Sequence, residues 1–331
     1  MSQRVGGETT DATRPPWAAM AFARTRGALL DELVLRAQSL PPIRMGVVHP
    51  CDARSLEGAL AARDKGLIVP TFVGPCAKIE AAARASGVSL EGVEIVDAPH
   101  SHAAADQAVE LVRRGRLHAL MKGALHTDEV MSAVVREGSG LRTDRRISHV
   151  FVIDAPTYHK LLLVTDAAIN IAPTLDVKRD IVRNAVDLAH AIGIERPKVA
   201  LLSAVETVEA KIPSTVEAAA LCKMADRGQI ADATLDGPLA FDNAISREAA
   251  EAKHIRSEVA GDPDILVAPD LEAGNILAKQ LVFLAGADTA GLVLGARVPI
   301  VLTSRADDVQ SRVVSSALAQ IFTHRPRQPP L

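Results

Sequence analysis

The chain has 331 residues, of which 48% are hydrophobic and 23% charged, and this balance excludes a disordered chain. Lysine and arginine number 37 against 40 aspartates and glutamates, so the net charge of −3 argues against a dedicated nucleic-acid binder. Aromatic residues make up 2%, too few for a surface on which bases could stack. No apolar run approaches 18 residues and no secretory signal opens the chain, so the sequence predicts a cytoplasmic protein that does not cross a membrane.

Short β-type runs alternate with helical runs along the first half of the chain. After a disordered tail over residues 1–18, strands are expected at 45–49, 67–73, 93–96 and 118–121. Helices are expected between and after them, at 55–65, 77–85, 103–114 and 127–136, the last with Thr127 as its N-cap. Strands separated by helices of this length predict parallel βαβ units and a sheet flanked by helices.

The pattern changes near Ser148, where two strand-like runs, 150–154 and 160–165, follow one another closely. They predict an antiparallel hairpin, which suits the seam between two α/β lobes. Alternation then resumes, with helices expected at 175–192, 214–226, 272–285 and 307–322 and strands at 199–203, 234–237, 265–268, 291–294 and 300–303. A (β/α)₈ barrel is the competing architecture, and the hairpin and the number of strands disfavour it.

The common phosphate-binding, metalloprotease and hydrolase motifs are absent, so candidate sites are taken from the ends of the predicted strands. The clearest is Ser304-Arg305, which follows an apolar strand and precedes a helix. An arginine there can bind two oxygens of a phosphate or carboxylate, and the hydroxyl and the helix N–H groups add donors. The competing interpretation is that Ser304 caps the helix and Arg305 is a solvated surface charge.

Other strand ends carry polar side chains, namely Asp236 with Asp242 and Asn243, Asn275, and Lys122 with His126. Lys122 could neutralise an anion, and His126 could titrate near neutral pH. Ordinary loops and helix caps are the competing interpretation at each place. Of the basic residues before the hairpin, Arg142 is the one expected to lie in a cleft.

Seven segments, in order between about residues 40 and 322, make the sequence resemble the phosphate acetyl/butyryltransferase family. They are MKG at 121–123, LRT at 141–143, LVTDAA at 163–168, DGPL with DNAI at 236–245, VAG at 259–261, PDLEAGN at 269–275 and TSRAD at 303–307. In its details the sequence resembles the butyryl-type branch more than the acetyl-type branch.

The resemblance implies a two-lobed α/β/α sandwich with mixed sheets, as in isocitrate and isopropylmalate dehydrogenases. Residues 19–146 and 296–331 would form the first lobe and 147–295 an inserted second lobe, with the active site in the cleft between them. The implied reaction is the reversible transfer of a short acyl group (butyryl, or else acetyl or propionyl) between coenzyme A and inorganic phosphate. It needs no metal or organic cofactor, and the family suggests a homodimer.

In this family the serine–arginine pair, here Ser304 and Arg305, lies in the cleft, and we expect Asp307 or else Asp308 to handle the thiol proton. The other strand-end residues and Arg142 are expected to bind substrate. Acetyl-type members have a proposed catalytic aspartate seven residues after the serine, where this chain has Ser311. They also have a Lys-Gly-Ser phosphate segment near the position where this chain has Glu206. The general base is therefore unassigned, but a thiol with a pKa near 8.5 is already partly ionised at neutral pH, so positioning could dominate.

Two other functions stay open on the sequence. The first is a metal-dependent decarboxylating dehydrogenase on the same fold, with Asp166, Asp236 and Asp242 as ligands. The second is a non-catalytic acyl-CoA-binding protein, because Ser311 removes the presumed base. Nicotinamide reduction that is lost in chelator would favour the first, and tight acyl-CoA binding without turnover the second.

Overall fold

A single mixed β-sheet of eleven strands forms the frame of the computed structural model, which describes residues 25–303 and 308–325. The strands are β1 Ile43–Val48, β2 Ile68–Gly74, β3 Glu94–Asp97, β4 Ala119–Lys122, β5 Ser148–Asp154, β6 Leu162–Thr165, β7 Lys198–Leu202, β8 Thr234–Leu239, β9 Ile265–Val267, β10 Asp288–Leu294 and β11 Ile300–Val301. The helices are α1 Ala28–Gln38, α2 Ala53–Asp64, α3 Cys76–Ser86, α4 Ser101–Arg113, α5 Thr127–Val135, α6 Leu175–Ala191, α7 Pro213–Asp226, α8 Phe241–Ile245, α9 Arg247–Ala252, α10 Leu271–Phe283 and α11 Val309–His324.

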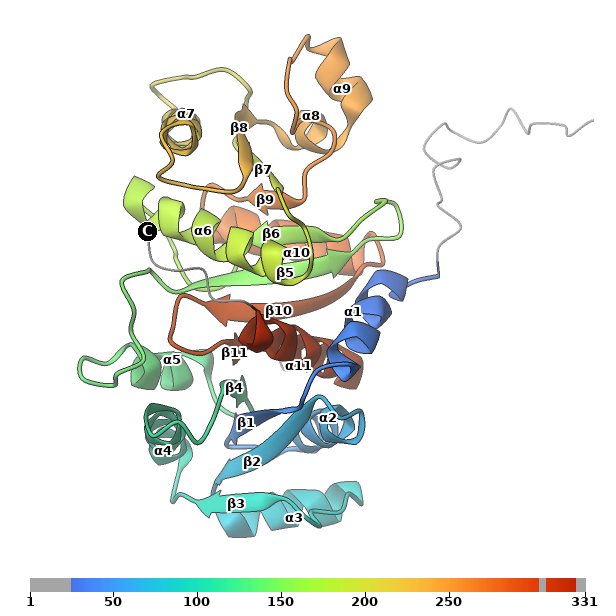
Figure 1. Ribbon diagram of the computed structural model, residues 1–331, viewed down its shortest axis with the longest axis vertical. Coiled ribbons are helices and arrows are strands. Elements are labelled where there is room, and N and C mark those ends of the chain that lie inside the picture. The colour runs from blue at the N-terminus through green and yellow to red at the C-terminus, as the bar shows by residue number, and fades with distance from the viewer. Residues whose placement is uncertain (1–24, 304–307, 326–331) are drawn as a thin grey trace, which may run out of the picture.

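The order of the strands is β3-β2-β1-β4-β11-β10-β5-β6-β9-β7-β8, and the sheet extends along the longest axis of the molecule (Figure 1). All strands from β3 to β11 are parallel, and so are those from β6 to β8. Between these two sets, β10 and β5 run antiparallel to their neighbours. The predicted hairpin is confirmed as β5 and β6. The mixed sheet is also confirmed, but it is one continuous sheet and not a separate sheet in each lobe.

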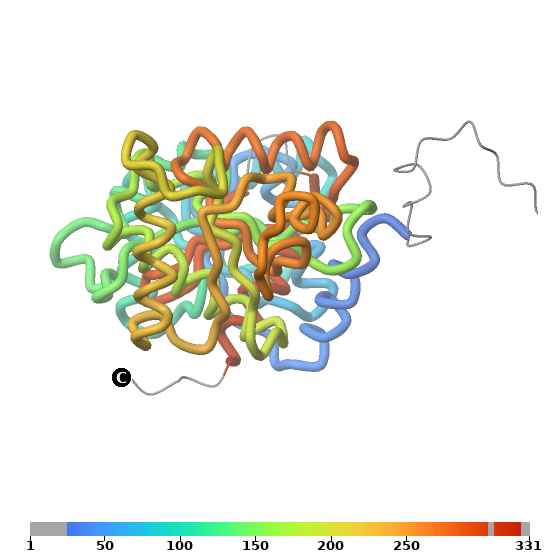
Figure 2. The backbone as a smooth tube through the Cα atoms, turned by 90° about the horizontal axis from the view of Figure 1, so that it is seen from above, coloured from blue at the N-terminus to red at the C-terminus, as the bar shows by residue number. Residues whose placement is uncertain are grey.

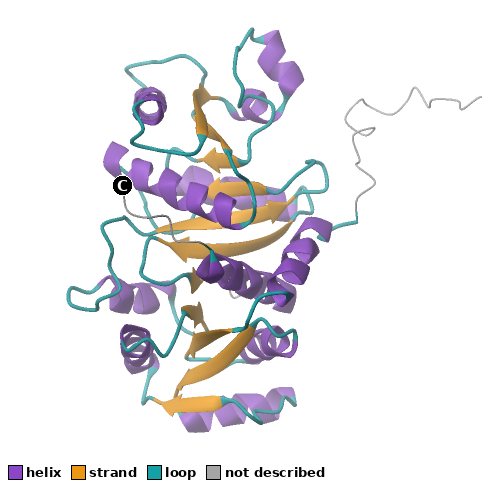
Figure 3. Cartoon of the chain, viewed as in Figure 1, coloured by secondary structure: helices purple, strands orange, loops and turns teal. Residues whose placement is uncertain are grey.

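Helices lie on both faces of the sheet, as Figure 2 and Figure 3 show. On one face, a buried apolar cluster spans the whole molecule beneath α1, α2, α6 and α11. On the other face there are two separate clusters, one involving α4 and α5 and the other involving α8, α9 and α10. The two halves of the molecule therefore share one core on the first face and have separate cores on the second.

The structure differs from the predicted elements in three places. Helix α1 was not predicted, although its buried residues Leu30, Leu33, Val34 and Ala37 follow the spacing of an amphipathic helix. Helix α5 begins at Thr127 as expected, but its N-cap is His126, whose backbone N–H donates to Glu129 Oε2 at 2.7 Å. Helices α8 and α9 occupy a stretch predicted as loop.

Candidate active site

The strands β1, β4 and β11 end at the same edge of the sheet. Val48 lies opposite Lys122, and Val301 lies opposite Met121 in parallel register. The chain leaving β11 therefore begins beside the end of β4, and Thr303 there is 4% exposed with no hydrogen-bond partner for its Oγ1 among the described residues. Helix α11 begins at Val309, where the Asp308 carboxylate accepts the backbone N–H of Ser311 at 2.8 Å.

Ser304, Arg305 and Asp307 lie outside the described residues, between Thr303 and Asp308. The structure therefore gives no geometry for the expected serine–arginine pair or for the expected acid. It does describe β4, which lies beside the end of β11, and helix α11, and each carries one cationic side chain that is almost completely buried.

Lys122 ends β4 and is 5% exposed. Its Nζ donates to the carbonyl oxygens of Gly123 at 3.3 Å and Leu125 at 3.1 Å, so the ammonium is held against the loop that follows the strand. Gly123 lies close to the end of β1, because a Cβ at this position would lie 2.5 Å from the Val48 carbonyl oxygen. This close approach fixes the position of the β4 loop.

Arg312 in α11 is a second buried cation at this edge, and the sequence analysis missed it. Its side chain is 2% exposed, and its Nη1 donates to the Lys122 carbonyl oxygen at 3.3 Å. It lies eight residues after Ser304, within the predicted helix. Residue type alone does not distinguish a buried arginine there from an exposed one. An arginine at a helix position that otherwise faces the core is the only signal that could have identified it.

His126 and Arg142 are both exposed. His126 serves as the N-cap of α5, which supports the competing interpretation of this residue as structural. Arg142 forms a single antiparallel bridge with Ala296, while its neighbour Leu141 is fully buried.

Asp242 and Asn243 lie together on α8, on the face of the sheet that also carries α9 and α10. Asp242 Oδ2 and Glu206 Oε2 are each 3.2 Å from Lys253 Nζ, and Asn243 Nδ2 donates to Glu206 Oε2 at 3.3 Å. Asn243 is completely buried, and its Oδ1 has no partner among the described residues. Glu206, found where the acetyl-type branch has its phosphate segment, thus organises an ion pair within the second half.

Asp236 binds its adjacent backbone, whereas Asn275 binds the chain just after β6, far away in sequence. Asp236 Oδ1 accepts the N–H of Gly237 at 2.8 Å, and Asn275 Nδ2 donates to the Ala167 carbonyl oxygen at 3.0 Å. Asp270 caps α10 by accepting the N–H of Ala273, as the competing interpretation of that segment predicted. These hydrogen bonds position the turns at the ends of the strands.

Asp166, a suggested metal ligand, is 2% exposed and surrounded by donors. Its carboxylate accepts backbone N–H groups from Ala168, Ile169 and Asn170 and the side-chain amide of Asn170. This saturation suits a structural carboxylate and leaves little room for a cation. Among the residues that the structure describes, no group of three or more His, Cys, Asp or Glu side chains could hold a metal ion.

His149 in β5 is another buried polar residue that the sequence analysis did not select. It is 1% exposed, its ring contacts Phe151 at 4.3 Å between centroids, and its Nδ1 has no partner in the described part of the chain. Gly291 makes space for it, since a Cβ there would lie 2.7 Å from His149 Nε2. Burial lowers the pKa of His149 to about 4, although the nearby Asp166 opposes the shift, so the imidazole is neutral at pH 7.

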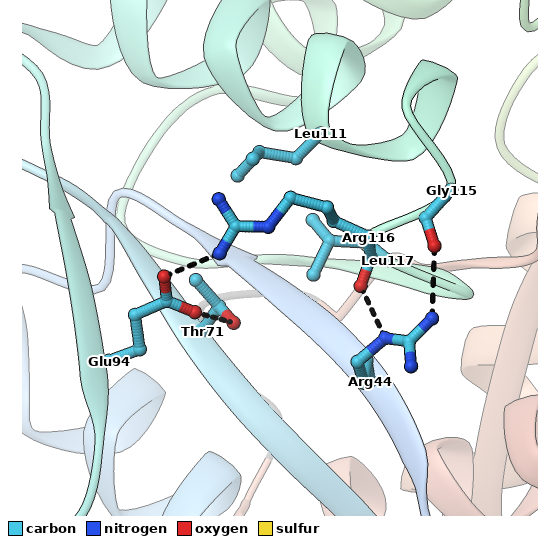
Figure 4. Close-up of a pocket in the computed structure, with 7 residues that line it drawn as sticks. All are labelled: Arg44, Thr71, Glu94, Leu111, Gly115, Arg116 and Leu117. Atoms are coloured by element: carbon cyan, nitrogen blue, oxygen red, sulfur yellow. Dashed lines mark hydrogen bonds and ion pairs between the residues drawn. The ribbon is translucent and has the colours of Figure 1, made fainter.

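A surface cavity of about 310 Å³ lies at the opposite end of β1 from Lys122 (Figure 4). Arg44 precedes Val48 by four residues, or about 13 Å along the strand. In this cavity Arg44 donates to the carbonyl oxygens of Gly115 and Arg116, and Arg116 forms an ion pair with Glu94 at 2.6 Å. Both guanidinium groups therefore already bind acceptors from the protein, and the cavity is separate from the candidate site.

Comparison with known proteins shows where this architecture occurs. Residues 101–320 match the family described as phosphate acetyl/butaryl transferase. A phosphate acetyltransferase of Rhizobium meliloti is 61% identical over 297 residues, which cover 90% of this chain and 94% of that protein. A phosphate butyryltransferase of Clostridium acetobutylicum is 40% identical, with coverage of 88% and 97%.

Solved structures agree with these sequence relatives. A branched-chain phosphotransacylase from Enterococcus faecalis V583 superposes with a TM-score of 0.75 at 31% identity, covering 86% of this chain and all of that one. A looser likeness, of fold alone, is to 4-hydroxythreonine-4-phosphate dehydrogenase from Klebsiella pneumoniae, with a TM-score of 0.53 at 14% identity and coverage of 86% and 100%. No helix within residues 25–303 and 308–325 is long and apolar enough to span a membrane.

Proposed function

Because the chain belongs to the phosphate acetyl/butyryltransferase family, we propose that acyl-CoA and inorganic phosphate react at the edge where β4 and β11 end. The protein is an acyltransferase of this family. The observation that carries the placement is the contact between Arg312 of α11 and the end of β4 at Lys122, both of them buried cationic residues. Two buried cationic side chains at one edge of the sheet place positive charge there, which supports the binding of an anionic substrate at this edge.

In the proposed reaction a phosphate oxygen attacks the thioester carbonyl carbon. The new C–O bond forms, the C–S bond breaks, and coenzyme A leaves as a thiolate that then takes up a proton. Arg305 holds the phosphate dianion, Ser304 donates to the oxyanion or to the sulfur, and Asp307 supplies or accepts the thiol proton. Lys122 adds positive charge, and catalysis comes mainly from positioning and charge stabilisation, because no aspartate occupies position 311.

The cleft for this reaction would lie between lobes formed by residues 19–146 with 296–331 and by residues 147–295, an arrangement like that of isocitrate and isopropylmalate dehydrogenases. The separate apolar clusters on one face of the sheet support this division. Exposed His126 and Arg142 belong to the first lobe and would contact substrate from there. In this proposal the reaction needs no metal or organic cofactor. The enzyme would act in the cytoplasm.

The preferred acyl group is the least constrained part of the proposal. Sequence details favoured the butyryl-type branch, whereas the acetyltransferase of Rhizobium meliloti has the higher identity, 61% against 40% for the clostridial butyryltransferase. We therefore propose a short-chain substrate that includes acetyl and butyryl groups.

Thiol release from acetyl-, propionyl-, butyryl- and longer acyl-CoA, with and without phosphate, tests the function directly. We expect release that depends on phosphate and falls for the longest chains. Release without phosphate would instead indicate a thioester hydrolase. Acyl-CoA binding without turnover, or nicotinamide reduction abolished by chelator, would support the two alternatives.

A further inference from the structure

Phe151 occupies the middle position of β5, a strand in the central part of the sheet (Figure 1). The other six residues of β5 are buried, and Phe151 is half-buried. A phenylalanine inside a sheet that helices cover is expected to be buried, because contact with water forfeits the free energy of apolar burial. Solvent therefore reaches the sheet from one side at this position.

The alternation of side chains along β5 identifies that side. Val150 and Val152 belong to the apolar cluster beneath α1, α2, α6 and α11, whereas Ile153 belongs to the cluster that involves α8, α9 and α10. Successive side chains of a strand point to opposite faces, so Phe151 lies on the same face as Ile153, and it packs partly against that cluster. This is the face on which the two halves of the molecule have separate cores.

Leu302 lies on the other side of the division between those cores. It directly follows β11, is half-buried, and packs against the cluster that involves α4 and α5. Val293 of β10 pairs antiparallel with Ile300, and two residues further along each strand this register brings Leu302 to the level of Gly291. Gly291 in turn pairs with Phe151. Two half-buried apolar side chains thus flank a glycine, about 10 Å apart across two strand spacings.

His149 supports the ring of Phe151 from within the sheet. The imidazole fills the space over Gly291, where a Cβ would lie 2.7 Å from His149 Nε2. It meets the Phe151 ring edge to face, with 4.3 Å between centroids and an interplanar angle of 67°, which is a favourable geometry for two rings. Because His149 is only 1% exposed, this contact holds one side of the Phe151 ring while another side stays open to solvent.

We propose that Phe151 limits the length of the acyl chain that the enzyme accepts, an inference that rests on the function proposed above. The open apolar surface on β5 is one side chain wide, because both strand neighbours of Phe151 are buried. Such a surface fits a short alkyl chain and not a helix or strand of another protein. Leu302 follows β11 directly, so the surface begins beside the strand end where the reaction is placed. The acyl carbonyl lies toward β11, and the methylene groups lose contact with water over Phe151.

The test measures kcat/KM for acetyl-, butyryl- and hexanoyl-CoA, together with the phosphate KM, in Phe151→Ala, Phe151→Leu and Phe151→Trp. In Phe151→Ala the hexanoyl-to-acetyl ratio of kcat/KM should rise at least about tenfold, because the missing ring makes room for a longer chain. Phe151→Leu should shift this ratio in the same direction by less. Phe151→Trp fills more space and should lower the butyryl-to-acetyl ratio at least about tenfold. The phosphate KM should change less than about threefold in all three variants, because the ring contacts the acyl chain alone.

Val152→Ala is the matched control, because it removes volume from the adjacent residue of β5 on the opposite, fully buried face. It should lower the unfolding midpoint and leave both ratios unchanged. If Phe151→Ala does not fold, the leucine and tryptophan variants decide, since each keeps a large apolar side chain. Unchanged ratios in the folded Phe151 variants overturn the role of Phe151, and so does an equal shift in Val152→Ala or a parallel rise of the phosphate KM. Absence of phosphate-dependent thiol release in the wild type overturns the proposed function instead.

Discussion

Arg305 is the side chain to which the proposed mechanism assigns most of the charge stabilisation. Arg305→Ala should lower turnover at least about a hundredfold, because the developing negative charge would lose its main bidentate donor. The measurement is phosphate-dependent thiol release under saturating substrates. Arg84→Ala, which removes an exposed arginine of α3 paired with Glu80, serves as the control and should keep full activity. Wild-type turnover in Arg305→Ala would exclude the assigned role.

His149 predicts a specific dependence of stability on pH. Its folded-state pKa of about 4 lies below the value near 6.5 of an unfolded histidine, so the unfolded chain binds the proton more tightly. The contribution of the neutral ring is complete above pH 6.5 and is lost as the pH falls toward 4. As the pH falls from 6.5 toward 4, the free energy of unfolding should decrease by about 3 kcal/mol less in His149→Phe than in the wild type. Urea unfolding at several pH values measures this difference.

The comparison for this prediction is His102→Gln, which changes an exposed histidine. It should keep the wild-type slope of unfolding free energy against pH. An identical slope in wild type and His149→Phe would show that His149 does not titrate with folding.

At the scale of elements, Asp262 joins the starts of β6 and β7. Its carboxylate lies 3.0 Å from Lys160 Nζ and 2.6 Å from Lys198 Nζ. Burial acts to raise the pKa of Asp262, but the hydrogen bonds and charges of Lys198 and Lys160 outweigh it and lower the pKa to about 2. Asp262 thus forms a small, partly buried ion network that clamps two strands of the sheet.

Asp262→Asn should reduce the free energy of unfolding by about 1–2 kcal/mol at pH 7, since Lys198 loses its carboxylate partner while Lys160 keeps its pair with Asp264. Because the folded pKa is depressed, this contribution is present above about pH 4 and disappears as the pH falls toward 2. Denaturant unfolding at pH 7 and pH 3 measures both effects. Asp226→Asn, in an exposed pair with Lys223, should change stability by less than about 0.5 kcal/mol. Equal effects of the two substitutions would contradict the argument.

The predicted elements succeed where the local pattern is strong and fail where it is weak. Long helices such as α6 and the β5–β6 hairpin follow directly from apolar spacing and turn residues. Helices α8 and α9 have only five and six residues, and such short segments carry too little periodicity to be recognised. The N-cap is His126 and not Thr127, and its backbone N–H donates to the Glu129 carboxylate three residues further on, which residue preference alone does not indicate.

At the scale of the whole molecule, α10 exposes a row of large apolar side chains. Ile276 is 59% exposed and Phe283 76% exposed, seven residues apart on one face of the helix, and Leu284 follows at 82%. Exposed Lys279 and Gln280 lie between Ile276 and Phe283, so the apolar surface is concentrated at Phe283 and Leu284. Neighbouring exposed apolar side chains of this size are typical of protein interfaces. We predict a homodimer that buries α10.

Light scattering after size exclusion should give twice the chain mass for the wild type and a single chain mass for Phe283→Glu combined with Leu284→Glu. Leu35→Glu, an exposed leucine of α1, is the control and should remain dimeric. A monomeric wild type, or a dimeric double variant, would contradict the predicted interface.

Local periodicity and ordered motifs were enough to predict the α/β class, the central hairpin and the family. They also placed Lys122 at a strand end and predicted the helix that follows Ser304 and Arg305. Each of these features depends on residues that are close together in the sequence, so it can be inferred without knowledge of long-range contacts.

Long-range packing, by contrast, makes the sheet continuous and brings Arg312, packed against Gly58, to the Lys122 carbonyl oxygen. Residues 58, 122 and 312 are far apart in the chain, and burial of a charge depends on packing that no local pattern records. The same holds for His149, whose ring occupies the space left by Gly291 of β10, a residue that pairs with Phe151 in the sheet. Long-range packing, not residue type, turned these side chains into buried polar groups.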